Sequence, residues 1–246
     1  MPIELVLDDE RAMRAGLVTD LQPDDERLAV LRPCMEHYGV GDGAAEWPNN
    51  LLSRRAVVYP TGRIARRGDE VRHAVDPAEL ASCRAMAEEI ARLMDGVEVG
   101  MGSDSGDGFR PFWIVADADA PPPKRIDEAL VVRAFAGTIF PLATMTVEPL
   151  AERGVWWSEV KADGAESTAA YLEPWRRLIE WFTTNPQFAD AAFIRIGERE
   201  ALWEAERKKE LLPAGTHLTG CVLPRLALGL AHTGSLVGLF GHVVQS

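Results

Sequence analysis

Two carboxylates, Asp117 and Asp119, have a type and spacing that could support chemistry. They follow the apolar segment 112–116, and side chains two residues apart on a strand point to the same face. Carboxylate oxygens are ligands that Mg²⁺ and Mn²⁺ prefer. The spacing therefore supports a metal site at Asp117 and Asp119. The simpler alternative is that both are loop acids at the end of a strand.

A second candidate site lies in an arginine-rich segment. Residues 54–72 contain six arginines against two acids, and Arg63, Arg66 and Arg67 are close together in it. Because guanidinium groups match carboxylate and phosphate groups in shape and charge, these three arginines are a candidate anion-binding patch. The alternative is a solvated hairpin whose arginines pair with the acidic N-terminal segment.

The chain has seven tryptophans, and two of them, Trp156 and Trp157, are adjacent. On a strand, adjacent side chains point to opposite faces, so we expect one of the two indoles to lie outside the main core. Exposed tryptophan is favoured at protein interfaces. The pair therefore predicts a partner-binding surface, with Trp47, next to Pro48, as a further member.

Other motifs lack the companions that chemistry would need. Cys34, Cys83 and Cys221 form no CxxC pair, so neither a disulfide framework nor a zinc site is expected, and the plain interpretation is three reduced thiols in a cytoplasmic protein. The glycine-rich segment 100–108 is followed by an apolar strand rather than the helix that a dinucleotide site requires. We assign no catalytic residue.

Composition sets the broad class. The chain has 246 residues, 47% hydrophobic and 26% charged, with a net charge of −12. These proportions are those of an ordinary globular protein, and the acidic balance argues against a nucleic-acid binder. We expect one domain over residues 1–246, and if the chain divides, the proline-rich segment 120–124 is the expected hinge.

Hydrophobic spacing and turn residues predict the elements. Asp76 and Gly96 bracket a helix over 77–95, and further helices are expected over 127–135, 168–184 and 198–212. Segment 111–116 is a continuous apolar run typical of a central strand. Segments 56–59 and 63–67 predict a hairpin, and 192–196 a strand. Helices and strands are interspersed, but the last quarter of the chain contains consecutive strands joined by short turns. This favours an α+β fold, a largely antiparallel sheet with helices packed on one side.

The C-terminal segment 226–244 has no charged side chain. Its length is close to that of a membrane-spanning helix. However, Thr233 and Gly234 provide a tight turn in its middle, which favours a buried C-terminal β-hairpin. We expect the hairpin, and therefore no membrane partner.

Two functions remain open. The first is an acidic cytoplasmic protein-binding module, immunity- or inhibitor-like and non-catalytic, that neutralises a basic protein partner and needs no cofactor. The second is a metal-dependent enzyme that holds Mg²⁺ or Mn²⁺ at Asp117 and Asp119 and meets an anionic substrate with the arginines of residues 63–72. The sequence leaves open whether the protein is an enzyme.

Overall fold

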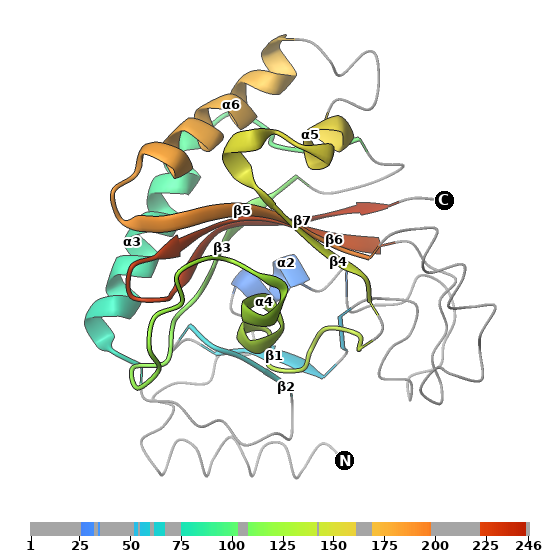
Figure 1. The fold of residues 1–246 in the computed structure, drawn as a ribbon. Helices are drawn as coiled ribbons and strands as arrows, with labels where there is room; N and C mark the ends of the chain where they lie inside the picture. Colours follow the sequence, from blue (N-terminus) through green and yellow to red (C-terminus); the bar gives the residue numbers. More distant parts are fainter. Residues whose placement is uncertain are drawn as a thin grey trace, which may run out of the picture.

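A five-stranded antiparallel sheet forms the centre of the molecule (Figure 1). The computed structural model describes residues 26–31, 34, 52–53, 55–59, 62–66, 75–102, 108–141, 143–160, 169–197 and 222–244. The strands of this sheet are β3 (Arg110–Ile114), β4 (Met145–Pro149), β5 (Phe188–Ile196), β6 (Val222–Ala231) and β7 (Leu236–Val244). Their order is β3-β7-β6-β5-β4, and every neighbouring pair is antiparallel. The α+β fold with a largely antiparallel sheet is confirmed.

The C-terminal hairpin is the middle of this sheet. Strands β6 and β7 pair along their length, with Leu226 opposite Phe240. The backbone N–H of Ala231 donates to the carbonyl of Ser235 at 2.8 Å, and Gly234 closes the turn with φ +100°, a conformation that glycine adopts without strain. Every residue of β6 is buried. The expected buried hairpin is therefore confirmed.

Helices and a small second sheet cover the large sheet. The helices are α2 (Glu26–Leu31), α3 (Pro77–Leu93), α4 (Glu128–Ala134), α5 (Val155–Val160) and α6 (Ala169–Thr184), with a short 3₁₀ turn, η2 (Leu150–Glu152). Figure 1 shows α5 and α6 on one face of the sheet, and α2, α4 and the hairpin of β1 (Ala56–Val58) and β2 (Ile64–Arg66) on the other. Helix α3 packs along β3 and β7. Helices therefore lie on both faces of the sheet, whereas the sequence predicted helices on one side only.

Helix α3 begins and ends where its sequence indicates. The Asp76 side chain accepts a hydrogen bond from the backbone N–H of Ala78 at 2.8 Å, and Pro77 occupies the first turn. Gly96, with φ +71°, follows its last turn. Between these ends Cys83, Met86, Ala87 and Ile90 are buried on one side of the helix, as their three- and four-residue spacing predicts.

Strand β3 is an edge strand, not the central strand that its apolar run predicted. It is nevertheless half to fully buried beyond Arg110 because α2 and α3 both pack against it. Pro111 has no N–H to donate, which suits an edge position. The apolar run therefore reflects cover from helices rather than strands on both sides.

Other expectations differ in outcome. Helices over 127–135 and 168–184 are confirmed as α4 and α6, the hairpin of 56–59 and 63–67 as β1 and β2, and the strand over 192–196 as part of the longer β5. The helix expected over 198–212 lies outside the described residues, and the hinge at 120–124 stays a prediction.

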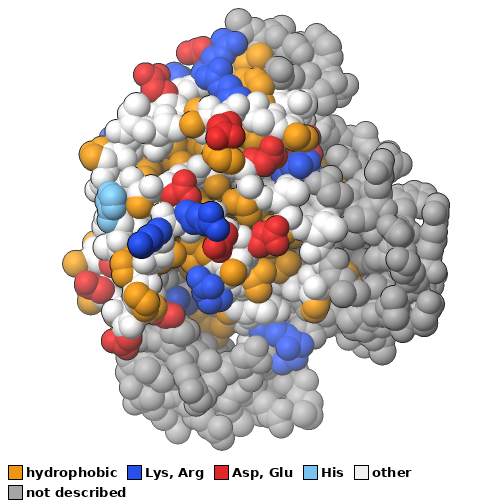
Figure 2. Space-filling model, viewed as in Figure 1, with side chains coloured by type: hydrophobic (Ala, Val, Ile, Leu, Met, Phe, Trp, Pro, Cys, Tyr) orange, Lys and Arg blue, Asp and Glu red, His pale blue; other side chains and the backbone are white. Residues whose placement is uncertain are grey.

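No helix in the described ranges combines the length and apolarity needed to cross a membrane. Figure 2 shows acidic, basic and apolar side chains interspersed on the face viewed.

Candidate functional site

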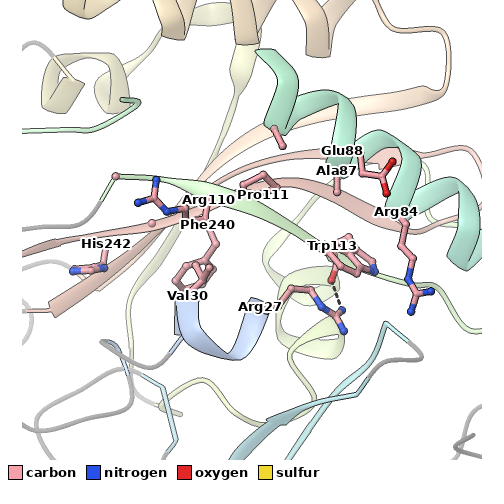
Figure 3. A pocket seen from close by; sticks show the side chains of 13 residues that line it. Arg27, Val30, Arg84, Ala87, Glu88, Arg110, Pro111, Trp113, Phe240 and His242 are labelled. Carbon is pink, nitrogen blue, oxygen red and sulfur yellow. Dashed lines mark hydrogen bonds between the residues drawn. The ribbon is translucent and has the colours of Figure 1, made fainter. Parts of the chain in front are cut away.

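A cavity of about 710 Å³ opens beside the edge strand β3, between α2 and α3 (Figure 3). Its size lies within the range of small-molecule sites. The lining combines charged and aromatic side chains: Arg27, Arg84, Arg110, Glu88, His242, Trp113 and Phe240. The rest of the wall is apolar or glycine: Val30, Ala87, Ala91, Gly108, Pro111 and Gly241.

Arg27 is the most constrained charged residue of this wall. Its side chain comes from α2 and is 1% exposed. Nη1 donates to the backbone carbonyl of Trp113 at 3.0 Å, and Nη2 donates to the carbonyl of Tyr59. The guanidinium carbon lies 4.1 Å from the centre of the Trp113 ring, within the range of a cation–π contact. Arg27 therefore joins α2 to the outer edge of β3 and fixes a positive charge at the cavity.

The other charged or titratable side chains lie on three elements that line the cavity. Arg84 and Glu88 are exposed and one turn apart on α3, and Arg110 is the exposed first residue of β3. His242, on β7, is 7% exposed. Among the described lining residues, three guanidinium groups stand against one carboxylate, although the chain as a whole is acidic.

Sequence reasoning missed this cavity. Its arginines come from α2, α3 and β3, and no local motif brings them together. One indication was available: Arg84 and Glu88 sit on the helix whose opposite side carries the apolar stripe. That spacing predicts an exposed charged pair, but it does not show which strand the pair faces.

Asp117 and Arg63, predicted for different sites, contact each other. Arg63 Nη2 and Asp117 Oδ1 form an ion pair, with side chains 10% and 35% exposed. The turn before Arg63 is held against the end of β3, since the Val115 N–H donates to the Gly62 carbonyl at 2.8 Å. Burial lowers the pKa of Arg63 to about 10, so its guanidinium stays charged at neutral pH. A salt bridge occupies the position where a metal ligand was expected.

The remaining parts of the predicted metal and anion sites are dispersed. Asp119 is exposed in the turn after β3, where the Ala120 N–H donates to the Asp117 carbonyl at 3.1 Å. Among the described residues no group of three His, Cys, Asp or Glu side chains could hold a metal ion. Arg66 is partly buried at the end of β2. Arg67 lies outside the described residues, as does Trp47.

Trp156 and Trp157 lie in helix α5, not on a strand, and both are buried, at 0% and 8% exposure. The helix starts here because the Glu148 carboxylate, from β4, accepts hydrogen bonds from the N–H groups of Val155 (2.8 Å) and Trp156 (3.2 Å), satisfying donors that a helix start leaves open. Trp156 stacks on Phe193 with ring centres 4.5 Å apart. The expected exposed indole is therefore wrong, and with it the reason for placing a partner surface here.

A charged network holds α5 on the sheet. Glu159 of α5 accepts from Arg195 Nη1 and from Arg225 Nε, both at 2.9 Å. Arg225 is fully buried, and its Nη1 also donates to the Pro224 carbonyl at 3.1 Å. Arg195 Nε lies 3.5 Å from Glu148 Oε2. Within the described part of the chain, two guanidinium groups thus face two carboxylates, and together they join α5 to β4, β5 and β6, which indicates a structural role.

Comparison with known proteins adds no family to this geometry. No protein-family model matches the chain, and no curated protein matches it. The α+β fold and the arginine-lined cavity are therefore the features from which a function is inferred.

Proposed function

We propose that this chain is a cytoplasmic binding protein and that the cavity beside β3 is its recognition site for an anionic group. The observation that carries the proposal is the buried guanidinium of Arg27, fixed in the wall by the carbonyls of Trp113 and Tyr59 and by the Trp113 ring. A charge held in a poorly hydrated wall acts on a ligand more strongly than one in water. A bound anion would therefore be stabilised by a positive charge that is already fixed in place.

Two further features support an organic anion rather than a simple inorganic ion. Arg84 and Arg110 add guanidinium forks that can bind carboxylate or phosphate groups through two parallel hydrogen bonds. Pro111 and Trp113, both half-buried, add apolar surface beside them. Sites of this size combine apolar walls with a few polar groups that fix orientation. The expected ligand carries an acidic group on an apolar body.

Calorimetric titration with octanoate tests this proposal, with octanol as the neutral control. We expect octanoate to bind and octanol to bind at least tenfold more weakly. The Arg84→Gln variant should weaken octanoate binding about tenfold, since a charge-assisted hydrogen bond contributes about 1.5–3 kcal/mol. The matched control is Arg92→Gln, an exposed arginine of α3 outside the cavity, which should leave the affinity unchanged. No binding of octanoate, or equal losses in both variants, would contradict the proposal.

The net charge of −12 favours a second proposal, that the protein neutralises a basic protein partner in the manner of an immunity protein or inhibitor. Acids and arginines are interspersed on the described surface (Figure 2), and most of the negative excess lies on residues outside the described ranges. Capture from extracts of the native host, followed by reconstitution with the purified partner, tests it. The expected complex is stoichiometric and weakens with salt. Failure to reconstitute a complex with any basic protein would exclude it.

A further inference from the structure

The β3 edge of the large sheet is protected against pairing with another strand. The N–H groups of Phe109 and Val115, just outside the ends of β3, donate to carbonyls of neighbouring segments at 2.7 and 2.8 Å. Between them, the carbonyl of Trp113 accepts from Arg27 at 3.0 Å, and Pro111 has no N–H to donate. Such protection is expected, because an unprotected edge offers a row of backbone donors and acceptors to another chain.

The opposite edge, formed by β4, is open. The Gly197 N–H donates to the Thr144 carbonyl at 2.7 Å, and these two residues continue the β4–β5 register by one pair. Because hydrogen-bonded pairs alternate with non-bonded pairs in an antiparallel ladder, the N–H and C=O groups of Met145 and Val147 point away from β5. Within the described ranges no hydrogen bond reaches these outward groups, and both residues are half-exposed.

Apolar side chains are exposed on both sides of this open edge. Val132 and Val155 are the exposed large hydrophobic residues of the described part of the chain, at 48% and 60%. Val132 belongs to α4, which packs against β4, and Val155 begins α5, where its N–H donates to Glu148 of β4. Figure 1 shows α4 and α5 on opposite faces of the sheet. A docked strand would therefore lie between apolar surfaces on both faces.

The sequence of β4 complements a second copy of itself. In an antiparallel pair with a two-fold axis at Thr146, Met145 of each copy lies opposite Val147 of the other and exchanges hydrogen bonds with it. Thr146 then faces its own counterpart, and Glu148 faces Thr144. Apolar side chains thus meet apolar ones, and no charge lies directly opposite a like charge.

A basic partner strand fits this edge less well. Glu148 is the carboxylate of β4, and it is already engaged: Oε2 lies 3.5 Å from Arg195 Nε, and the two oxygens accept from the N–H groups of Val155 and Trp156. We propose that the chain forms a two-fold symmetric dimer through β4, which joins the two five-stranded sheets into one antiparallel sheet. The surface lies at the opposite edge from the anion cavity, so this proposal does not rest on the proposed function.

Sedimentation equilibrium of the full chain over a range of concentrations tests the dimer. Val147→Pro removes an outward N–H, which the β4–β5 ladder does not use. It should weaken the dimer about tenfold or more, because each copy loses a hydrogen bond worth about 0.5–1.5 kcal/mol. The matched control, Val147→Ile, keeps the N–H and should leave the affinity within about threefold. Because each copy carries a net charge of −12, the dimer should strengthen as salt screens the repulsion.

Cysteine cross-linking tests the register and does not depend on the proline variant folding. Thr146→Cys should form an intermolecular disulfide with oxidised glutathione, because the two-fold axis brings the two Cα atoms to about 4.5 Å. Thr144→Cys, on the same face of the chain, should not exceed the wild-type background, since its two copies are roughly 13 Å apart along the strands. A chain that stays monomeric at every concentration would contradict the proposal and leave the edge to another partner. A dimer that Val147→Pro does not weaken, or equal cross-linking of the two cysteine variants, would contradict it as well.

Discussion

Arg63 and Asp117 form an ion pair that links the β1–β2 turn to the end of β3. Each residue had a separate chemical role in the sequence-based hypotheses, one as an anion binder and the other as a metal ligand. Their contact gives both a structural role, because a guanidinium that is 90% covered is costly to bury without an opposite charge.

Replacing Asp117 with Asn should destabilise the fold. The change removes the charge that faces Arg63, and breaking a fully buried pair costs about 3–5 kcal/mol. Because the Asp117 side chain is 35% exposed, we expect a smaller loss, about 1–2 kcal/mol. Asp119→Asn, at an exposed neighbouring carboxylate, should cost less than about 0.5 kcal/mol. Denaturant unfolding of both variants measures the difference, and equal stabilities would contradict the structural role.

The network around Arg225 should be more sensitive than a surface pair. Glu159→Gln removes the carboxylate that accepts from Arg195 and Arg225, and leaves a buried guanidinium less compensated. We expect a loss of about 2–4 kcal/mol in the free energy of unfolding. The control is Glu173→Gln, which breaks the exposed Arg176–Glu173 pair at 3.8 Å and should cost at most about 0.5 kcal/mol. Comparable losses in the two variants would argue against the network.

Gly238 is required by the close pairing of β6 and β7. A Cβ at this position would lie 2.0 Å from the Ala227 carbonyl oxygen and 2.9 Å from the Leu228 Cα, and these backbone atoms cannot move without breaking the sheet. Gly238→Ala should therefore lower the free energy of unfolding by about 3 kcal/mol or more. A Cβ added at Gly96 would meet no atom within 4 Å, but the backbone there has φ +71°. Gly96→Ala should therefore lower the free energy of unfolding by only about 1–2 kcal/mol. Thermal unfolding of both variants tests this ranking, which the reverse order would contradict.

The buried thiol of Cys83 should make stability fall at alkaline pH. Burial raises the pKa of Cys83 from 9.0 to about 12, so above about pH 9 the unfolded chain loses this proton before the folded protein does. The contribution of this thiol to the free energy of unfolding is therefore complete below its pKa in the unfolded chain. It declines as the pH rises toward its pKa in the folded protein. Between about pH 8 and pH 10 the thiol accounts for a loss of about 1.4 kcal/mol. The Cys83→Ala variant should lack this part of the decline in unfolding measurements at the two pH values. An unchanged pH dependence would show that Cys83 ionises equally in both states.

Elements with local signals were predictable from the sequence. The cap at Asp76, the glycine at position 96 and the turn at Thr233 and Gly234 act through neighbouring residues, and each stands where expected. Helix α5 is different, because the carboxylate that caps it belongs to Glu148 on the preceding strand. Sequence spacing does not show that this side chain turns back onto the helix.

The candidate site depends on contacts between distant segments. Strand β3 is an edge strand because β7, a strand of the C-terminal hairpin, is its one partner in the described sheet. The outer edge of β3 is then covered by Arg27, which approaches from α2. Neither contact leaves a pattern in the local sequence, so the cavity appears only when the tertiary structure is known.

The central claim is that the cavity beside β3 binds an anion. The most direct measurement is a crystal structure of the protein with octanoate. The account predicts octanoate in the cavity, with its carboxylate on the arginine-lined wall and its chain over Pro111. A cavity that stays free of octanoate under saturating conditions, or octanoate bound elsewhere on the molecule, would contradict it.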